Sequence, residues 1–317
     1  MSGLLERLSV EFTLPMDDLI YLVKSAPYRY KVYEIAKKTP GKKRTIAQPA
    51  RVLKPLQYWV MENVLSKFPI HPAATAYRKG KNIADNAMPH VSNRFLCKMD
   101  FRSFFPSIKS TDFERFLSTG PFGGAWTVEE VGYLSRILFW RRERGGELRL
   151  SIGAPSSPLI SNILLYRFDV AVTHLCSSHG VAYTRYADDL TFSTNERGVL
   201  ERIEREIPRI CTRLESPRLF LNRSKTVRAS KKGARKVTGL ILTNDALVSV
   251  GREKKREVRA AFHKFVLGEL DAEETAKLAG TVAYINSIEP EYLQRLSQKY
   301  GAIALSSLLS SKRLSGN

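Results

Sequence analysis

Two adjacent aspartates between two short strands constrain the fold of this chain more than any other feature. Asp188 and Asp189 stand between the strand-forming segments Tyr183–Tyr186 and Leu190–Ser193, which predicts a tight hairpin with both acids at its tip. Side chains alternate along a strand, so one acid can face a site while its neighbour faces away or reaches back. The plainer alternative makes both acids ordinary turn residues, since Asp favours turns. The aromatic Tyr186 and the apolar strands on both sides argue against that alternative.

A third carboxylate, Asp100, ends a segment with the pattern of a buried strand. The segment Phe95–Phe101 is apolar, and Phe104 and Phe105 follow closely. An isolated ionised carboxylate in such surroundings is costly, so we expect Asp100 to be paired or to bind a cation. Three carboxylates from two neighbouring strands can hold two Mg²⁺ ions, which take oxygen ligands and leave positions open for phosphate. Two such ions about 4 Å apart promote in-line displacement at phosphorus, so the acids indicate nucleotidyl transfer.

The charge of the chain points to nucleic acid as a partner. The 317 residues carry 51 Lys and Arg against 31 Asp and Glu, a net charge of +20. Residues 37–54 hold seven Lys and Arg with no acid, and residues 223–259 hold twelve against three acids. Two compact basic blocks fit phosphate contacts at defined places. An anionic membrane surface is the second choice of partner, and a solvated basic face is the plainer alternative.

The sequence carries no signal for a membrane, for secretion or for a disulfide framework. No apolar run approaches the roughly 18–20 residues that span a bilayer. Residues 1–18 mix acids with apolar residues and contain no basic segment of the kind that opens a signal peptide. Three cysteines are too few and too scattered for a disulfide framework or a zinc site. We therefore expect a cytoplasmic protein of about two domains with no membrane partner.

Periodicity and turn residues predict an α+β body followed by a small helical domain. Further strands are predicted at Tyr30–Ala36, at Arg44–Gln48 after a turn at Pro40-Gly41, at Arg235–Leu242 and at Ala246–Val250. Helices are predicted at 15–25, around Pro55, at 127–141, from a cap at Ser157 to about Cys176, and at 196–215, 252–268, 272–286 and 290–304.

Three ordered motifs resemble those of reverse transcriptases. The sequence Tyr-Ala-Asp-Asp at 186–189 looks like their metal-binding box. Asp100, followed by Phe-Phe-Pro-Ser at 104–107, resembles their first carboxylate motif, and Gly153–Pro158 resembles the loop and helix start between the two. Two further boxes are similar to those of bacterial retron enzymes. They are the NAxxH element at Asn86–His90 and the VTG element at Val237–Gly239.

The resemblance covers about residues 28–304 and implies a right-hand polymerase with fingers, palm and thumb. The implied domains are N-terminal helices and fingers at 1–95, with 127–150 contributing, a palm with an antiparallel sheet at 96–250, and a helical thumb at 251–317. The compact length leaves no room for a ribonuclease H domain, an endonuclease or a maturase extension, which is similar to retron enzymes as well.

The resemblance also implies catalytic roles for individual residues. Asp100, Asp188 and Asp189 would be metal ligands, with the main-chain carbonyl of Phe101 as an extra ligand. The implied cofactor is a pair of Mg²⁺ ions, with Mn²⁺ as a possible substitute. Lys225 matches the lysine that is proposed to protonate the leaving pyrophosphate; a surface lysine is the alternative.

The nucleotide-binding residues that the resemblance implies are Arg44, assisted by Lys43 or Lys42, Phe105, Gly153 and Ala154. Arg44 would bind the triphosphate through charge-assisted hydrogen bonds. Phe105 would be a sugar gate whose ring clashes with a ribose 2′-OH and so favours dNTPs, a role compatible with a place in the core. Gly153 would let the backbone approach the template or nucleotide closely. Ile152 stands where many relatives have Gln, so we assign it no polar role.

RNA contacts are implied for both retron boxes and for the start of the thumb. Asn86 and His90 would hydrogen-bond to RNA or to each other, with a capping role for Asn86 as the alternative. The other implied RNA-binding residues are Val237, Thr238, Gly239, Arg252, Lys254, Lys255, Arg256 and Arg259. The thumb aromatics Tyr284, Tyr292 and Tyr300 would either stack on unpaired bases or pack within the helices.

The function implied by the resemblance is Mg²⁺-dependent, RNA-templated DNA synthesis from dNTPs on a cognate structured noncoding RNA (msr-msd). Priming from a guanosine 2′-OH would give a branched, RNA-linked single-stranded DNA, the msDNA. A role in antiphage defence with a neighbouring effector protein is implied as well. The alternatives are another bacterial reverse transcriptase lineage, defence-associated or related to group II introns, a catalytically idle RNA-binding scaffold, and an RNA-dependent RNA polymerase, against which Phe105 argues.

Overall fold

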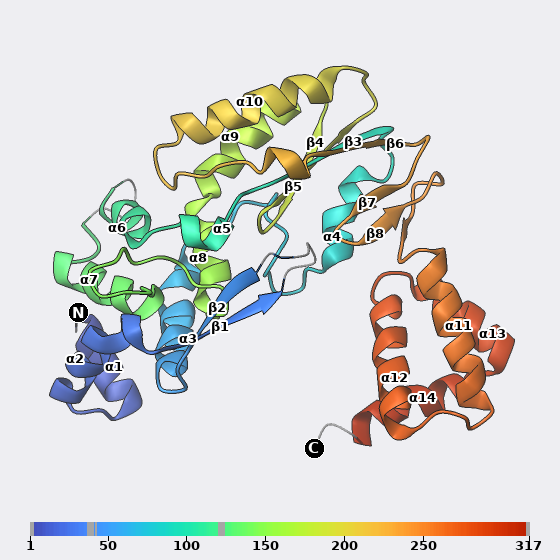
Figure 1. Cartoon of the computed structure of the whole chain (residues 1–317), viewed down its shortest axis with the longest axis horizontal. Coiled ribbons are helices and arrows are strands. Elements are labelled where there is room, and N and C mark those ends of the chain that lie inside the picture. The colour runs from blue at the N-terminus through green and yellow to red at the C-terminus, as the bar shows by residue number, and fades with distance from the viewer. Residues whose placement is uncertain (1–2, 37–40, 42, 120–123, 315–317) are drawn as a thin grey trace.

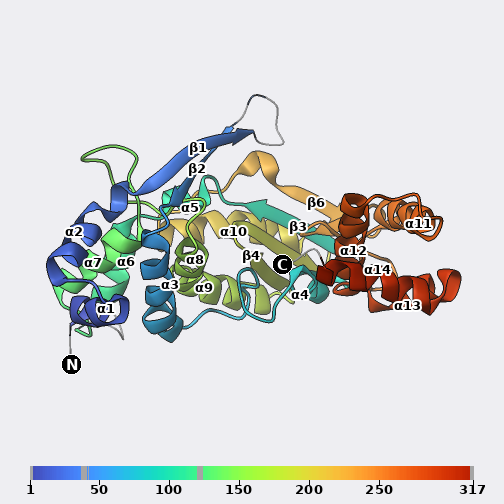
Figure 2. The ribbon, with the colours of Figure 1, turned by 90° about the horizontal axis from the view of Figure 1, so that it is seen from below.

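The chain folds into a large body that carries the strands and a helical unit at the C-terminal end (Figure 1). The computed structural model describes residues 3–36, 41, 43–119 and 124–314, with side chains up to residue 310. The N-terminal and C-terminal helices lie at opposite ends of the molecule, with the sheets between them (Figure 2). The α+β expectation is confirmed.

Short amphipathic helices form the N-terminal end of the body. They are α1 (Leu4–Phe12), α2 (Met16–Ser25), α3 (Leu53–Asn63), α6 (Ser110–Ser118) and α7 (Val128–Leu138), with 3₁₀ turns η1 (Ala26–Tyr28) and η2 (Leu65–Lys67). The expected helices at 15–25 and 127–141 are present, although α7 ends at Leu138. Thr127 caps α7 through its side chain, which accepts from the Glu130 N–H at 3.2 Å.

A two-stranded hairpin, β1 (Tyr30–Ala36) with β2 (Lys43–Pro49), projects from the body (Figure 2). The expected turn lies partly outside the described residues, since Pro40 is not among them; Gly41 has the positive φ, 74°, that a tight turn asks for. Ala47 of β2 donates its N–H to the Ile152 carbonyl at 2.9 Å. This bond attaches the base of the hairpin to the loop before α8.

A four-stranded antiparallel sheet forms the centre of the body. Its order is β4-β5-β3-β6, with β3 at Phe95–Asp100, β4 at Ala182–Tyr186, β5 at Asp189–Thr194 and β6 at Val227–Ser230. Helices α9 (Tyr166–Ser177) and α10 (Val199–Arg213) contact one side of this sheet. The short helix α4 (Ile83–Ala87) and the 3₁₀ turn η3 (Met88–His90) contact β4 and β5. The other 3₁₀ turn near the sheet is η5 (Arg223–Lys225).

The helix expected from Ser157 to Cys176 is divided. Helix α8 spans Ser156–Leu164, and Leu165 caps its C-terminal end. The axis of α9 is bent by 51° from that of α8. The break lets α8 pack against α3 and α6 while α9 packs against β4. Ser157 is not the cap, because Pro155 takes that position and Ser157 is buried within the first turn. Among the described residues no single helix could cross a membrane, and only this bent pair passes on length and composition.

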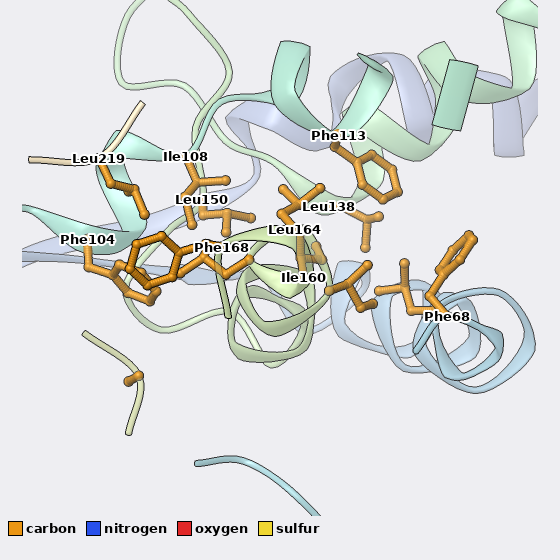
Figure 3. Packing of buried hydrophobic residues seen from close by; sticks show 14 of the residues in the cluster. Phe68, Phe104, Ile108, Phe113, Leu138, Leu150, Ile160, Leu164, Phe168 and Leu219 are labelled. Carbon is orange, nitrogen blue, oxygen red and sulfur yellow. The ribbon is translucent and has the colours of Figure 1, made fainter. Parts of the chain in front are cut away.

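Apolar side chains from α3, α6, α8, α9 and the central sheet form the main core. Figure 3 shows this packing, which extends from Phe104 and Leu219 at one end to Phe68 and Phe113 at the other. The short helix α5 (Phe104–Ser107) is anchored here, because Phe104 is 4% exposed and its ring is stacked 5.8 Å from that of Phe101. The core therefore fixes the segment that follows Asp100.

A second, three-stranded sheet covers α4. It consists of β7 (Arg235–Val237), β8 (Leu240–Leu242) and β9 (Val248–Ser249). The single strand expected at Arg235–Leu242 is wrong, because Thr238 and Gly239 have positive φ of 45° and 88° and turn the chain back on itself. A separate apolar cluster holds this sheet against the body.

The C-terminal unit consists of four helices with a core of their own. They are α11 (Arg252–Val266), α12 (Ala272–Asn286), α13 (Pro290–Tyr300) and α14 (Ala302–Leu314). The helix expected at 290–304 stops at Tyr300, because Gly301 takes φ 91°. Tyr292 is 5% exposed and belongs to this core, so it is a packing residue and not a free stacking surface. Tyr284 is 42% exposed.

Candidate active site

The three aspartates come together where β3 ends and the β4–β5 hairpin turns. The strands β3 and β5 are antiparallel neighbours, and their register sets Asp100 directly opposite Asp189. Residues directly opposite one another point to the same face, with Cβ atoms about 5 Å apart. Tyr186 is opposite Asp189 in the β4–β5 pair, so Ala187 and Asp188 alone form the loop. The third acid therefore stands at the tip, next to the opposed pair.

The hairpin turn is tight and strained. A two-residue loop between antiparallel strands favours positive φ at its first position, where glycine is common. Ala187 holds this position with φ 56°. Such a conformation costs free energy for an L residue and persists where the surroundings impose it. The Phe101 N–H donates to the Asp188 carbonyl at 3.0 Å and ties the turn to the end of β3.

Burial and mutual repulsion act on the carboxylates. Burial first, and then the charges of Asp189 and Asp100, raise the pKa of Asp188 to about 6. Burial also raises the pKa of Asp189, against the opposing charge of Lys98, and Asp100 adds to the rise. Lys225 Nζ donates to both carboxylate oxygens of Asp100, at 2.9 and 3.0 Å. The site concentrates negative charge that the Lys225 ammonium offsets in part.

This donor set fits Mg²⁺. Mg²⁺ takes oxygen ligands and is bound through one or two carboxylates together with substrate phosphates. Two acids opposed on one sheet face, beside a third whose pKa they raise, make a place where a divalent cation relieves repulsion. As the side chains stand in the described part of the chain, no group of three or more His, Cys, Asp or Glu residues is arranged to hold a metal ion. The Asp100 carboxylate forms an ion pair with Lys225. A bound cation would share this carboxylate with the Lys225 ammonium.

The ring of Phe105, which follows Asp100 by five residues in the sequence, is partly exposed. Phe105 is half-buried on α5, and its ring lies 5.2 Å from that of the anchored Phe104. Ser103 turns the chain between β3 and α5 with φ 50°. A fixed aromatic ring that keeps part of its surface open can contact a ligand without reorganising, as a steric gate requires.

The projecting hairpin places Arg44 within electrostatic reach of Tyr77. Arg44 is exposed on β2. Burial raises the pKa of the Tyr77 hydroxyl, the neighbouring Tyr186 and Asp188 raise it further, and the positive charge of Arg44 opposes them. Arg44 and Asp188 are thus each within electrostatic reach of the Tyr77 hydroxyl. An exposed arginine can donate charge-assisted hydrogen bonds to phosphate oxygens.

Among the other residues expected to contact the nucleotide, one is paired, one is buried and one lies outside the described residues. Lys43 forms an ion pair with Glu34 across the hairpin, at 3.1 Å, and Lys42 lies outside the described residues. A Cβ at Gly153, whose φ is 121°, would come within 3.2 Å of the Ala47 carbonyl oxygen. Within the protein, the close approach that Gly153 permits is to β2, and the expected approach to template or nucleotide stays a prediction. Ala154 is buried.

Comparison with known proteins settles the family. The family described as reverse transcriptase (RNA-dependent DNA polymerase) matches residues 35–242. The chain is 40% identical over 294 residues to the Retron Ec83 reverse transcriptase of Escherichia coli, across 92% of this chain and 93% of that protein. The chain belongs to the retron reverse transcriptases. The enzyme is therefore an RNA-directed DNA polymerase, and the resemblance that its motifs indicated is confirmed.

A second retron enzyme and two solved structures are also similar to this reverse transcriptase. It is 32% identical over 306 residues to the Retron Ec86 reverse transcriptase of Escherichia coli, across 94% of this chain and 90% of that protein. Among solved structures, apo telomerase from Candida tropicalis is similar with a TM-score of 0.48 and 11% identity, over 87% of this chain and 58% of that one. A foamy viral protease–reverse transcriptase in complex with double-stranded DNA is similar with a TM-score of 0.41 and 15% identity, over 91% of this chain and 44% of that one.

In this reverse transcriptase the NAxxH element lies inside the protein. Asn86 and His90 have no exposed surface, so the expectation that their side chains contact RNA is wrong. His90 bridges the β4–β5 hairpin, with Nδ1 2.7 Å from Ser193 Oγ on β5 and Nε2 2.8 Å from Thr184 Oγ1 on β4. Burial lowers the pKa of His90 to about 3, so the ring is neutral.

The capping role considered for Asn86 is also wrong. Asn86 Oδ1 accepts from the Thr75 hydroxyl at 2.8 Å, and the Asn86 carbonyl accepts from Thr184 Oγ1 at 3.2 Å. The cap of α4 is Asn82, whose side chain accepts from the Ala84 N–H at 2.7 Å. The element therefore supports the β4–β5 hairpin from one side of the sheet.

The VTG element is mostly a packing unit. Val237 is fully buried in the cluster beneath the second sheet, so a direct RNA contact by this side chain is wrong too. Thr238 donates its hydroxyl to the Ile83 carbonyl of α4 at 3.2 Å, and Gly239 is exposed at the turn. The two retron boxes are thus in contact with each other through α4.

The basic start of α11 is largely open. Arg252, Lys254, Arg256 and Arg259 are exposed, and Lys254 pairs with Glu257 at 3.1 Å. Lys255 differs, because its ammonium pairs with Glu289 and lies 5.8 Å from the centre of the Tyr292 ring. This pairing links α11 to the segment before α13, and the expected role of Lys255 as a phosphate contact stays a prediction.

Sequence reasoning missed two residues beneath the hairpin. Arg185 and Asp169 form an ion pair with no exposed surface on either side chain, at 2.6 Å between Nη2 and Oδ2. The available signal was weak. Asp169 interrupts the apolar face of α9 between Phe168 and Val172, and Arg185 precedes the YADD box within a strand. A buried acid is almost always paired with a buried cation, but the sequence does not show which Lys or Arg is the partner.

Proposed function

We propose that this retron reverse transcriptase copies a cognate structured noncoding RNA (msr-msd) into DNA with Mg²⁺ held by Asp100, Asp188 and Asp189, and by the Phe101 carbonyl. Priming takes place from the 2′-OH of a guanosine in that RNA, which gives a branched, RNA-linked single-stranded DNA, the msDNA. The system acts in antiphage defence together with a neighbouring effector protein. The retron boxes and the relationship to retron enzymes support the proposal.

A single observation carries the metal assignment. Asp100 and Asp189 are opposed on neighbouring strands, and their charges help to raise the pKa of Asp188 to about 6. Without a cation the fold would hold three acids together at a cost and to no structural purpose. A polymerase that joins nucleotides through two metal ions needs such a set of oxygen ligands.

The chain's own groups supply the rest of the chemistry. Bound Mg²⁺ neutralises phosphate charge and activates the attacking hydroxyl. Arg44 donates hydrogen bonds to the triphosphate oxygens and so orients the dNTP. Phe105 leaves no room for a 2′-OH on the incoming nucleotide. Lys225 holds a proton beside Asp100, where the leaving pyrophosphate can take it.

The RNA is bound by exposed cations of the thumb. Arg252, Lys254, Arg256 and Arg259 lie on the first turns of α11 with their side chains exposed, and they suit phosphate contacts along a folded RNA. The turn at Thr238-Gly239 adds an exposed main-chain edge. In the proposed division, fingers, palm and thumb occupy residues 1–95 with 127–150, residues 96–250 and residues 251–317.

The test uses the protein expressed with its native upstream DNA, beside an Asp188→Asn/Asp189→Asn twin. Nucleic acid is extracted from both and run on a denaturing gel, with and without ribonuclease and debranching enzyme. A discrete single-stranded DNA, present only with the active protein and shifted by debranching, is the expected result. A DNA without a branch would overturn the priming mode alone.

The twin also tests the metal assignment. Asp→Asn removes the charge and keeps the size, so the twin should bind the RNA as the wild type does while making no DNA. Full synthesis by the twin would overturn the assignment of Asp188 and Asp189 as metal ligands. RNA in both samples and DNA in neither, with no extension of a supplied primer–template, would make the chain a scaffold.

A further inference from the structure

A buried arginine lies directly beneath the catalytic turn. Arg185, on β4, is one of two arginines among the described residues that have almost no exposed surface; the other is Arg235. Its Nε donates to Asp169 Oδ1 at 2.9 Å, and its Nη2 donates to Asp169 Oδ2 at 2.6 Å. Tyr183 donates its hydroxyl to the same Asp169 Oδ1 at 2.8 Å. The guanidinium is thus held in a fixed plane by a carboxylate that is itself fixed to α9.

The remaining nitrogen of Arg185 reaches the turn. Its Nη1 donates to the main-chain carbonyl of Ala187 at 3.2 Å and to Asn162 Oδ1 of α8 at 3.1 Å. Ala187 is the strained first residue of the two-residue loop, with φ 56°, and its carbonyl belongs to the peptide that leads into Asp188. A bond to this carbonyl orients that peptide and with it the Asp188 side chain.

Arg185 and its partner Asn162 also hydrogen-bond to the segment 73–76, which precedes Tyr77. The Arg185 N–H donates to the Ala73 carbonyl at 2.7 Å, and the Thr75 N–H donates to the Arg185 carbonyl at 2.9 Å. Asn162, bound by Arg185, donates its amide to the Ala76 carbonyl at 2.9 Å. Tyr77 follows in a strained conformation with φ 59°, and its ring lies 6.3 Å from that of Tyr186.

Stability alone does not account for such a network. Desolvating two charges costs about as much as their attraction returns, and apolar residues of similar volume are often neutral or stabilising in place of a buried ion pair. What apolar residues cannot provide is a directed donor at the Ala187 carbonyl. The arrangement therefore supplies geometry at the turn that carries the metal ligand.

We infer that Arg185, fixed by Asp169, is a positioning residue for metal binding. It sets the Asp188 carboxylate through the Ala187 carbonyl, and it sets Tyr77 through Asn162 and the 73–76 segment. The inference rests on the proposed assignment of Asp188 as a metal ligand. Groups that orient metal ligands commonly change metal affinity by about 10- to 100-fold when they are removed.

The experiment measures primer extension on a supplied primer–template as Mg²⁺ is varied, with activity expressed per folded molecule. Two variants are compared. Arg185→Lys keeps the charge and loses the planar fork, and Arg185→Met/Asp169→Leu removes both charges so that no unpaired ion is left buried. In each we expect the Mg²⁺ concentration for half-maximal rate to rise about 10-fold. We also expect kcat at saturating Mg²⁺ to fall about 100-fold in the double variant, with KM for primer–template unchanged.

The matched control is Arg235→Met. Arg235 is as deeply buried, but within the described residues it donates only to main-chain carbonyls outside the 187–188 turn, which are those of His90, Val91, Asn93, Leu242 and Thr243. Its loss should lower the melting temperature and leave the Mg²⁺ midpoint unchanged. A folded double variant with the wild-type Mg²⁺ midpoint and kcat would overturn the inference, and so would an equal midpoint shift in the control. Asp188→Asn separates the two proposals, because activity retained in that variant would remove the metal assignment itself.

Discussion

The buried His90 should make the stability of the body depend on pH in a way that one substitution removes. The ring is neutral in the folded protein because burial lowers its pKa from 6.5 to about 3. Between these values the unfolded chain binds a proton that the folded chain excludes, so stability falls as the pH is lowered through 6.5. At pH 5 the loss attributable to His90 is about 2 kcal/mol relative to pH 8, and it grows further toward pH 3.

The matched variant is His90→Gln. An amide can serve the Ser193 and Thr184 hydroxyls without titrating. Urea unfolding is followed by tryptophan fluorescence at pH 8 and pH 5, because Trp59, Trp126 and Trp140 all lie in the body and none in the C-terminal helices. The wild type should lose about 2 kcal/mol more than the variant over this range. Equal losses in both proteins would refute the reasoning.

Three further substitutions test other parts of the structure. Phe105→Ala should raise ribonucleotide incorporation about 10-fold in a dNTP/NTP competition assay, and an unchanged ratio would remove the steric gate. Gly153→Ala should cost about 1–3 kcal/mol in urea unfolding, because φ is 121° and the new Cβ meets the β2 backbone, whereas Gly233→Ala, with open space around it, should be close to neutral. Lys254→Ala should lower the salt slope of RNA binding by about 1, whereas Lys255→Ala should chiefly destabilise the thumb, as thermal unfolding would show.

The β4–β5 hairpin was predictable because its signals are local. Alternation in β4 and β5 fixes which side chains share a face, but the expectation that both acids stand at the tip is wrong, because Asp189 begins β5 and pairs with Tyr186, which leaves Asp188 as the one acid at the tip. Asp100 was predictable for a different reason, since a carboxylate at the end of an apolar strand needs a partner. The strand β1 has the same bounds in the structure as in the sequence analysis, because Pro40-Gly41 and the flanking alternation define it.

The surroundings of the hairpin were not predictable, because they depend on groups far apart in the chain. The partners of His90 are 94 and 103 residues away, and Asp169 is 16 residues from Arg185. A polar residue on a short helix is as compatible with the surface as with the interior until those partners are known. The expectation of RNA contacts at Asn86 failed for this reason. The break at Leu165 likewise follows from two different packing surfaces and from no residue at the break.

The position of these buried groups explains how a small sheet can carry three like charges at one edge. Burial first, and then the charges of Asp189 and Asp100, raise the pKa of Asp188 to about 6, and the repulsion among the three carboxylates acts to move the hairpin and β3 apart. Two buried side chains, His90 and Arg185, form hydrogen bonds next to the hairpin tip that resist this separation; we call them clamps. His90 joins β4 to β5, and Arg185 joins the turn to α8 and α9. Because the clamps bear the repulsion, the acids stay together without a cation, and a metal ion that binds them spends little of its binding energy on assembling its ligands.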